Sequence, residues 1–519
     1  MQLTQALHKA LREKPQHTAV VCGSQRASFA QVHQRVAKLG AALCALGMQP
    51  GDRVAMLSMN SMRYVEYFFG VWWGGGAINP VNVRWSPKEV AYSLDDCDTK
   101  ILLVDKTFAP MVPALRAQSK SLHTVVYCGD DATPEGMVAY EDLMEKAQPM
   151  ADARRQRDDL AAVMYTGGTT GMPKGVMLSH GNLYACALAS MAAVPKPWQV
   201  IGVATAPFFH VAGCGLSVQL MLRMTTQVVL PFYEEVAVLQ AISSERATEI
   251  FLVPTMIKRL IEHPRFAEFD LSSLRMMLYG AAPIDATLLG EAMRLLPNVQ
   301  FCQAYGMTEL SPTIAVLLPE DHLPGPNQAK RLRSAGRSVP IAEVRIVDPE
   351  GNELPHGQVG EIAARGPMVM QGYWNKPAET AAALKDGWMH TGDGGMMDEE
   401  GYLYVVDRIK DMIVSGGENV YSAEVENALA QLPGISMSAV IGVPDDKWGE
   451  RVHAVLVLRE GAVLDEAAVI AHCKTLIAGY KCPRSVEFRT EMPVSPAGKL
   501  QKFILRAPYW GSPRFQCNK

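Results

Sequence analysis

The stretch Val163–His180 reads Val-Met-Tyr-Thr-Gly-Gly-Thr-Thr-Gly-Met-Pro-Lys-Gly-Val-Met-Leu-Ser-His. It follows an apolar run, Leu160–Tyr165, that is typical of a strand, and it contains a glycine- and threonine-rich loop with one lysine. Glycines let backbone N–H groups come close to an anion, and threonine hydroxyls and a lysine ammonium add further donors. The stretch therefore predicts a loop that holds a polyphosphate, with a helix beginning near Ser179 or Asn182.

Two other interpretations of this stretch compete. Glycine- and threonine-rich runs are most often flexible linkers, but here a strand precedes the loop and an apolar segment resumes at Val176. A Walker-type phosphate loop requires Gly-Lys followed at once by Ser or Thr. Lys174 lies between Pro173 and Gly175, so that motif is absent.

The composition limits the class of protein. The chain has 519 residues, which predicts two to four domains, and it is 48% hydrophobic and 20% charged, as is typical of compact proteins. Its net charge of −4 without a basic run gives no indication of a nucleic-acid partner. Ten scattered cysteines without a C-x-x-C pair argue against a zinc site or a disulfide framework, and we expect a cytoplasmic protein. The longest apolar run, Tyr67–Trp73, is too short to span a bilayer.

Strand-like and helix-like segments alternate over the first 400 residues. This rhythm predicts an α/β fold with parallel-rich sheets covered by helices. From about Gly336 the pattern changes to β-like segments separated by turns, which indicates a β-rich subdomain. A charged break, Asp407–Asp411, precedes a small α+β unit. We expect a large N-terminal domain over residues 1–406, a hinge over 407–411 and a small mobile C-terminal domain over 412–519.

Several expected strands end in residues suited to nucleotide chemistry. Tyr305-Gly306-Met307-Thr308-Glu309 combines an aromatic face, a hydroxyl and a hard oxygen ligand for Mg²⁺. Asp393 follows a glycine turn, as acidic residues that bind a ribose do. His210 follows two phenylalanines at a strand end, and Lys499 lies in a Pro-x-Gly turn. Taken alone, each of these residues fits an ordinary turn or core position at least as well as a functional one.

Taken together, the motifs resemble the adenylate-forming enzymes, a superfamily that includes acyl-CoA synthetases, peptide-synthetase adenylation domains and luciferase-like proteins. The resemblance covers nearly the whole chain and rests on motifs in the family's order: Tyr165–Gly175, Tyr305–Glu309, Thr391–Asp393, Asp407–Lys410 and Gly498–Lys499. It implies a two-step reaction. A carboxylate attacks the α-phosphate of ATP to give an acyl-adenylate and pyrophosphate, and a thiol then attacks the acyl carbon and releases AMP.

The resemblance also implies roles for individual residues. Catalytic roles fall on Lys499, which would bridge the attacking carboxylate and the α-phosphate, and on His210, Thr308 and Glu309. Thr308 would contact the α-phosphate, Glu309 would bind Mg²⁺, and His210 would gate the passage between the acid pocket and the thiol tunnel. The positions implied in nucleotide and CoA binding are Thr166, Gly167, Gly168, Thr169, Thr170, Gly171, Lys174, Ala281, Ala282, Tyr305, Asp393, Arg408, Gly416, Gly417, Trp448, Tyr480 and Arg484. Lys410 lies at the family's hinge, where the C-terminal domain rotates between the two half-reactions.

The implied substrates are ATP with Mg²⁺, CoA and a hydrophobic carboxylic acid. The expected acid pocket, around Phe208, His210, Gly213, Gly280, Ala281 and Gly306, has no counter-charge for an ammonium group. The Gly-Gly form at Gly168, where serine is usual, favours a medium- or long-chain fatty acid, with an aryl or arylalkenoic acid second. Cys482 departs from an arginine found in an aryl-CoA ligase, which removes one expected phosphate contact.

Three functions stay open at this point. The first is an AMP-forming acid:CoA ligase, the second is an adenylating enzyme that passes its acyl group to a carrier protein or another acceptor, and the third is a nucleotide-binding pseudoenzyme. The presence of Lys499, Glu309 and Asp393 argues against the third. No membrane span is expected, and a homodimer is left open.

Overall fold

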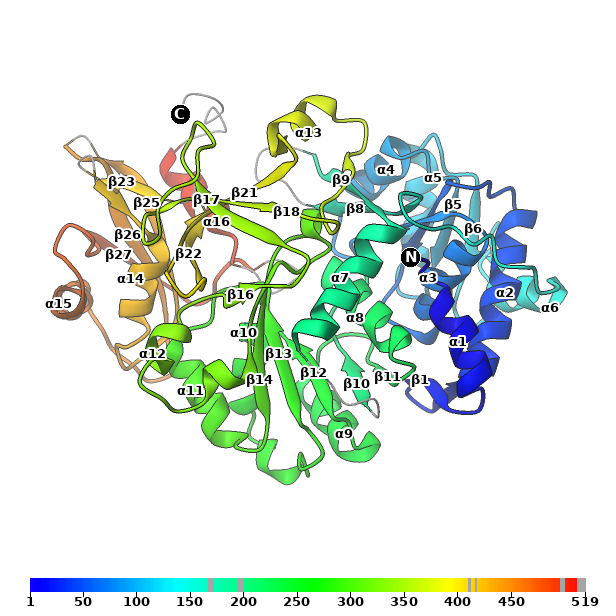
Figure 1. The fold of residues 1–519 in the computed structure, drawn as a ribbon, viewed down its shortest axis with the longest axis horizontal. Helices are drawn as coiled ribbons and strands as arrows, with labels where there is room; N and C mark the ends of the chain where they lie inside the picture. The colour runs from blue at the N-terminus through cyan, green and yellow to red at the C-terminus, as the bar shows by residue number, and fades with distance from the viewer. Residues whose placement is uncertain are drawn as a thin grey trace.

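A computed structural model describes residues 1–166, 172–194, 200–408, 412–415, 418–445, 447–494 and 500–510, with the backbone alone at 407, 408, 418 and 419. It is an α/β protein with two large mixed sheets, a β-rich subdomain and a small C-terminal α+β unit (Figure 1). The predicted fold class is therefore confirmed. In the described residues, no helix is long and apolar enough to cross a membrane.

One large sheet has the strand order β16-β15-β14-β13-β12-β10-β11-β1-β2. Its central strands, from β14 to β1, are parallel, and the strands at both edges are antiparallel. The bounds are β1 Thr18–Cys22, β2 Gln25–Ser28, β10 Ile201–Ala204, β11 Thr226–Val229, β12 Glu249–Leu252, β13 Met276–Gly280, β14 Gln300–Tyr305, β15 Ala315–Leu317 and β16 Arg337–Ser338. Because parallel strands end at the same edge, β13 and β14 bring their carboxyl ends together.

The other large sheet has the order β19-β9-β8-β4-β3-β5-β6-β7. Strands β8, β9 and β19 pair antiparallel, and the remaining neighbours pair parallel. The bounds are β3 Arg53–Leu57, β4 Ala77–Pro80, β5 Ile101–Val104, β6 Thr124–Tyr127, β7 Val138–Ala139, β8 Leu160–Thr166, β9 Lys174–Ser179 and β19 Gly372–Tyr373. The segment Lys174–Ser179 is thus a strand that returns along β8, and the predicted helix starts after it.

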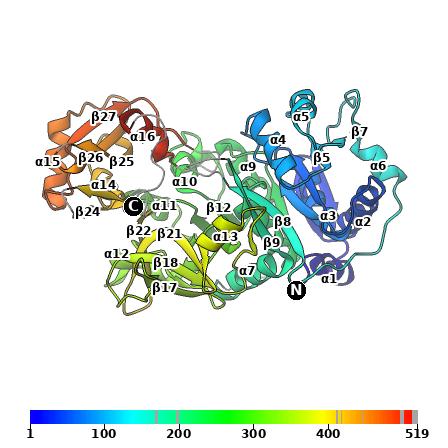
Figure 2. The same ribbon diagram turned by 90° about the horizontal axis from the view of Figure 1, so that it is seen from above.

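Helices α7 and α8 lie between the two sheets (Figures 1 and 2), and one hydrophobic core includes residues of both sheets and both helices. Helix α3 is mostly apolar and is buried in this core, with Trp72, Tyr67 and Phe68 fully enclosed. The helices are α1 Gln5–Glu13, α2 Phe29–Ala45, α3 Met62–Trp73, α4 Pro87–Asp96, α5 Val112–Gln118, α6 Tyr140–Lys146, α7 His180–Ala193, α8 Val211–Leu222, α9 Glu235–Glu245, α10 Pro254–Ile261, α11 Ala286–Leu295, α12 Gln328–Arg331, α13 Pro377–Ala383, α14 Ser422–Leu429, α15 Glu466–Leu476 and α16 Lys502–Trp510. Short 3₁₀ turns are η1 Ala109–Met111, η2 Phe266–Glu268, η3 Thr308–Leu310 and η4 Pro319–His322.

Local sequence explains where several helices begin. Ser28, Ser86 and Ser179 each accept from the backbone N–H three residues on, and the side chain of that third residue accepts from the serine N–H. This reciprocal capping satisfies amide groups that a helix start otherwise leaves unpaired. Ser179 therefore sets the start of α7, as the sequence predicts.

Two smaller sheets complete the fold. The β-rich subdomain has the order β17-β18-β21-β20, with β22 on β21, and the C-terminal unit has the order β24-β23-β26-β25, with β27 on β26. The bounds are β17 Glu343–Val347, β18 Gly360–Arg365, β20 Leu384–Lys385, β21 Trp388–Met397, β22 Leu403–Arg408, β23 Ile413–Ser415, β24 Glu418–Val420, β25 Ile435–Asp445, β26 Gly449–Leu458 and β27 Ser485–Arg489. Strand β22 reaches Arg408, so the β-rich sheet extends into the first residues of the expected hinge.

Candidate active site

The expected phosphate loop is the tip of an antiparallel hairpin. Thr166 ends β8 and pairs with Lys174, the first residue of β9. The residues between them that we expect to hold phosphates, Gly167–Gly171 (Gly167, Gly168, Thr169, Thr170, Gly171), lie outside the described residues. At the base of the hairpin, the Tyr165 hydroxyl donates to Asp96 Oδ2 at 2.7 Å, and burial raises the pKa of this tyrosine. The hairpin places the lysine and a threonine opposite each other at the mouth of the loop.

The expected adenine site lies where β13 and β14 end. Gly280 pairs with Ala304, and a Cβ on Gly280 would lie 2.2 Å from the Ala304 carbonyl oxygen, so only glycine permits this close pairing. Ala281 follows in the left-handed region, at φ +64°, a strained conformation for a non-glycine residue. Ala281, Ala282 and Tyr305 therefore lie at one edge of the sheet, and their role in framing a base stays a prediction.

A hydrogen bond joins two expected nucleotide ligands that are far apart in sequence. The Tyr305 hydroxyl donates to Asp393 Oδ2 at 2.7 Å, which brings the end of β14 against β21. Asp393 is only 6% exposed, and its backbone N–H donates to Thr391 Oγ1 at 3.1 Å. Arg408 lies opposite Asp393 in the register between β21 and β22. The structure thus gathers the residues expected at the adenine and the ribose.

The expected metal ligand Glu309 is a buried carboxylate in the turn η3, directly after Thr308. It is 6% exposed, and its Oε1 accepts a hydrogen bond from the Tyr373 hydroxyl at 2.9 Å. The ammonium of Lys174 lies over the ring of the same tyrosine, 5.1 Å from its centroid. A carboxylate and a lysine expected to act on one polyphosphate therefore meet at one aromatic side chain.

Glycine makes the turn before η3 possible. A Cβ on Gly306 would lie 1.9 Å from the Pro312 carbonyl oxygen, so the chain after β14 can double back only with glycine here. Thr308 and Glu309 then sit on a short 3₁₀ turn rather than continuing the strand. The spacing Tyr305-Gly306-x-Thr308-Glu309 is in this way fixed by backbone geometry.

The donor set fits Mg²⁺ in one specific way. Among the described residues there is no group of three or more His, Cys, Asp or Glu side chains that could hold a metal. Mg²⁺ needs no such cage, because it binds through one or two carboxylates together with substrate phosphates. A single buried carboxylate, Glu309, near the phosphate hairpin matches that arrangement.

His210 lies at the N-cap of α8, where β10 has ended and the chain turns. Its ring packs at 4.4 Å from that of Phe209. The preceding Phe208, expected in the acid pocket, is instead fully buried against Tyr64 and Phe68 in the main core. Phe208 therefore anchors the segment that carries His210 and does not line a pocket.

An aromatic and basic patch lies on the C-terminal unit. The Arg484 guanidinium lies 4.4 Å and the Lys447 ammonium 5.0 Å from the Trp448 ring centroid. Tyr480 is 40% exposed, and the Glu424 carboxylate raises the pKa of the neighbouring Lys481. The structure thus brings together Trp448 and Arg484, which the sequence assigns to CoA.

The structure does not test the predicted roles of some residues. Cys482 is 2% exposed in the core of the C-terminal unit, so it offers no surface contact to a phosphate. Lys499, Lys410, Gly416 and Gly417 lie outside the described residues, and Arg408 is described by its backbone alone. Their roles stay predictions, as do the domain boundaries and the homodimer.

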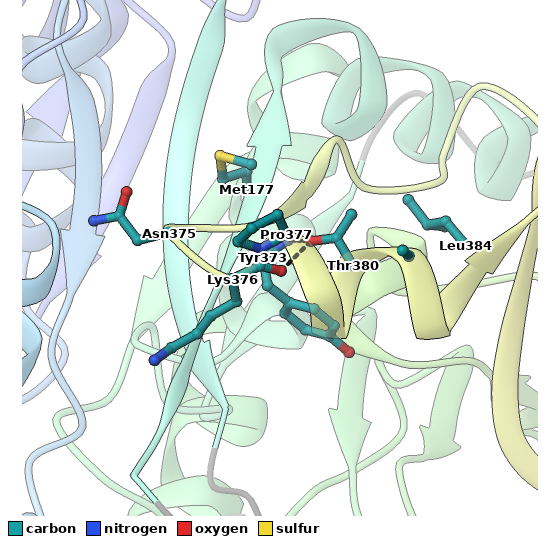
Figure 3. Close-up of a pocket in the computed structure, with 8 residues that line it drawn as sticks. Met177, Tyr373, Asn375, Lys376, Pro377, Thr380 and Leu384 are labelled. Atoms are coloured by element: carbon teal, nitrogen blue, oxygen red, sulfur yellow. Dashed lines mark hydrogen bonds between the residues drawn. The ribbon is translucent and has the colours of Figure 1, made fainter.

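The sequence did not identify Tyr373 as a functional residue. Its only local signal is an aromatic residue after Gly372, ahead of the proline that opens α13. Beside this segment lies a pocket of about 410 Å³ (Figure 3), lined by Met177, Tyr373, Asn375, Lys376, Pro377, Thr380, Ala381 and Leu384. None of the site residues predicted from the sequence lines it, so it is not the expected acid pocket.

Known proteins with similar sequences agree on one family. The model of the AMP-binding enzyme family matches residues 7–374, and that of the AMP-binding enzyme C-terminal domain matches residues 424–499. A feruloyl-CoA synthase of an Amycolatopsis species is 39% identical over 95% of this chain and 96% of its own. The fatty acid–[acyl-carrier-protein] ligase ScoC of Streptomyces coeruleorubidus is 35% identical over 96% of this chain and 95% of its own. The solved structure of the anthranilate CoA ligase AuaEII in complex with anthranoyl-AMP covers 98% of this chain and 97% of its own, with 28% identity and a TM-score of 0.90.

Proposed function

The chain belongs to the AMP-binding enzyme family, an acid–thiol ligase family of the adenylate-forming superfamily, and we propose that it activates a hydrophobic carboxylic acid as an acyl-adenylate and transfers the acyl group to CoA. One observation carries this proposal. The hydrogen-bonded pair Tyr305–Asp393 and the group Lys174–Tyr373–Glu309 lie on either side of the single turn that follows β14. That arrangement suits a nucleoside at one end and a polyphosphate at the other.

The nucleoside end would hold the adenine and ribose of ATP. Ala281, Ala282 and Tyr305 would frame the base, and the Asp393 carboxylate would accept from the ribose hydroxyls, with Arg408 beside it in register. Because Asp393 is buried and already held by Tyr305, its orientation is set before the nucleotide arrives. Such preorganisation lowers the cost of binding.

The polyphosphate end would neutralise charge as pyrophosphate leaves. Thr166, the loop residues 167–171 and Lys174 would hold the β- and γ-phosphates, and Thr308 would contact the α-phosphate. Glu309 would hold Mg²⁺, which when bound neutralises phosphate charge. Phosphoryl chemistry of this kind depends mainly on positioning and electrostatic stabilisation.

The proposed reaction has two steps. A carboxylate oxygen of the acid bonds to the α-phosphorus, and the bond from that phosphorus to the bridging oxygen breaks, so pyrophosphate departs with the electron pair. The Lys499 ammonium would stabilise the charge at the reacting oxygens. In the second step a thiolate sulfur bonds to the acyl carbon, and the bond from that carbon to the phosphate oxygen breaks, so AMP leaves with the electron pair. Rotation at Lys410 would withdraw Lys499 between the steps.

The acceptor is proposed to be CoA on the basis of the C-terminal patch. Trp448 offers a flat face for the CoA base, while Arg484 supplies a guanidinium for its phosphates and Tyr480 lies exposed nearby. Gly416 and Gly417 would line the pantetheine passage, with His210 at its inner end. ScoC supports the alternative acceptor, an acyl carrier protein, because its name assigns it that partner.

For the acid, we now place an aryl or arylalkenoic acid first and a medium- or long-chain fatty acid second. The aliphatic preference from the sequence depends on Gly168 alone, a residue outside the described part of the chain. The names of the feruloyl-CoA synthase and of the anthranilate ligase support the aromatic class, and that of ScoC supports the aliphatic class. We also propose a cytoplasmic location, since the cysteines in the described residues form no disulfide bonds.

The test is an assay of the purified protein with ATP, Mg²⁺, CoA and a panel of acids. AMP release that requires both an acid and CoA, with a thioester product, is the expected result. Acid-dependent pyrophosphate exchange without a thioester would favour a carrier-protein acceptor. Absence of both signals with every acid would contradict the proposed activity. Within the panel, the kcat/KM values for ferulate and benzoates are compared with those for octanoate and palmitate.

A further inference from the structure

One buried side chain, Tyr373, contacts two groups of opposite charge. Its hydroxyl donates to Glu309 Oε1 at 2.9 Å, and its ring face carries the Lys174 ammonium at 5.1 Å from the centroid. Figure 3 shows the Tyr373 ring extending away from Met177. Tyr373 is 9% exposed and Glu309 6% exposed, so their hydrogen bond is buried, whereas Lys174 is half-buried.

The backbone around Tyr373 is tied down on several sides. Strand β19 pairs antiparallel with β9, with Tyr373 opposite Val176, and the Tyr373 N–H donates to Thr380 Oγ1 at 2.9 Å. The Trp374 N–H donates to the Gly175 carbonyl at 2.7 Å, and the Trp374 ring N–H donates to the Asp96 carbonyl at 2.9 Å. The ring of Tyr373 therefore has little freedom to move.

The turn that carries Glu309 is held by the same segment. The Met370 N–H donates to the Glu309 carbonyl at 2.9 Å, and the Ser311 hydroxyl donates to the Met368 carbonyl at 2.8 Å. Residues 368–374 thus connect the turn η3 to the strand that begins with Lys174. None of these bonds uses the Tyr373 side chain, so we expect the connection to persist when that side chain is changed.

We propose that Tyr373 is a positioning residue that sets the Glu309 carboxylate and the Lys174 ammonium toward Mg²⁺ and the polyphosphate of ATP. The inference rests on the proposed function, because it takes Glu309 as the metal ligand and Lys174 as a phosphate ligand. Tyr373 touches neither substrate nor metal in this role. It acts through the two charged groups it holds.

The chemistry of the side chain explains why tyrosine suits this position. A buried carboxylate needs hydrogen-bond donors, and the phenol supplies one without adding a charge that would compete for the metal. The negative ring face attracts an ammonium group by its quadrupole. Phenylalanine keeps the ring face but loses the donor, and leucine loses both. The two substitutions therefore separate the contact with Glu309 from the contact with Lys174.

The test measures nucleotide binding by calorimetry, with neither acid nor CoA present. The ligands are ATP with Mg²⁺, ATP with a chelator, and AMP. For Tyr373→Phe we expect the Mg²⁺-dependent gain in ATP affinity to fall about tenfold, with AMP affinity within twofold of the parent protein. For Tyr373→Leu we expect the affinity for ATP with chelator to fall as well, because Lys174 loses its ring.

Tyr140→Phe is the matched control. The Tyr140 hydroxyl donates to Glu66 Oε2 at 2.6 Å, and both residues are 1% exposed. Helix α6, which begins at Tyr140, lies on the side of the fold away from β14 and β21 (Figure 1). The nucleotide affinities of Tyr140→Phe should not change. A Tyr373→Phe protein that binds all three ligands like the parent, or that loses AMP affinity as much as ATP affinity, would overturn the inference.

A second measurement tests whether Tyr373 acts through Glu309. Glu309→Gln should itself abolish most of the Mg²⁺-dependent gain, and adding Tyr373→Phe to it should cause no further loss of that gain. A further loss of similar size would show that Tyr373 acts independently of Glu309 and would refute the proposal. Failure of the proposed function is distinguishable, since it appears as absence of acid-dependent AMP release in the parent protein.

Discussion

The hydrogen bond between Tyr305 and Asp393 offers the sharpest test of the nucleoside end of the site. Tyr305→Phe removes the hydroxyl that holds Asp393 Oδ2 at 2.7 Å and keeps the ring that would face the adenine. A hydrogen bond to a charged group contributes about 1.5–3 kcal/mol. The Asp393 backbone stays anchored to Thr391, so the lower value applies. We expect the Kd for AMP to rise about tenfold, which corresponds to ~1.4 kcal/mol.

The assay is a double-mutant cycle with AMP as ligand. If Tyr305 acts by orienting the carboxylate, Asp393→Ala should weaken AMP binding further than Tyr305→Phe does, and the double variant should bind like Asp393→Ala alone. Tyr402→Phe is the control, since the Tyr402 hydroxyl donates to the buried Asp321 at 2.6 Å in a comparable bond outside the proposed site. Its AMP affinity should match that of the parent protein.

Additive losses in the double variant would refute this reasoning. They would mean that the Tyr305 hydroxyl contributes to AMP binding without Asp393. An unchanged Kd for Tyr305→Phe would equally show that the bond does not prepare the ribose site. Circular dichroism and thermal unfolding of each variant establish that the protein measured is folded.

Three further outcomes follow from the same structure. Trp448→Ala should raise the KM for CoA about tenfold, through loss of base stacking and of the Arg484 contact, while pyrophosphate exchange keeps its rate. Lys499→Ala should slow adenylation by several orders of magnitude but leave thioester formation from supplied acyl-adenylate nearly intact; equal loss of both steps would contradict its assigned role. Burial lowers the pKa of His180 to about 4, so between pH 6.5 and 4 the unfolded chain binds a proton that the folded chain does not. The unfolding free energy should therefore fall by about 2 kcal/mol from pH 7 to pH 5, and His180→Leu should remove that part of the loss in urea titrations.

The fold was largely predictable because its main signals are local. Short apolar runs such as Thr18–Cys22 alternate with capped helices, and parallel strands joined by helices follow from that alternation. The edge where β13 and β14 end was also predictable, since each run stops at glycine or at small residues. Residues expected to frame the adenine accordingly emerge at one edge.

The antiparallel pairing of β9 with β8 and with β19 was not predictable. The strand Lys174–Ser179 has six residues, and an apolar run of that length does not distinguish a strand from the start of a helix. Strand β19 has only two residues, and its partner lies almost two hundred positions earlier in the chain. Because Tyr373 belongs to β19, its contacts with Glu309 and Lys174 were invisible in the sequence.

Contacts between distant segments also explain why the sequence identified Tyr305 and Asp393 as site residues but did not predict their hydrogen bond. Each residue belongs to a recognisable motif, yet their hydrogen bond depends on how β21 of the β-rich subdomain meets the end of β14. Motifs identify which residues carry chemistry, and packing between sheets decides which of them touch. The family resemblance identified the residues that carry chemistry, and the structure showed which of them are in contact.

The site thus has two ends that are held by two different tyrosine–carboxylate bonds. Tyr305 binds Asp393 of the β-rich subdomain, whereas Tyr373 binds Glu309 beside the phosphate hairpin. If the two ends are energetically separate, removing the Tyr305 hydroxyl should weaken the binding of AMP and of ATP alike. Removing the Tyr373 hydroxyl should weaken only the binding of ATP with Mg²⁺. The two tyrosine-to-phenylalanine variants therefore test each other, because a site that responds as one rigid unit would give the same ligand pattern for both.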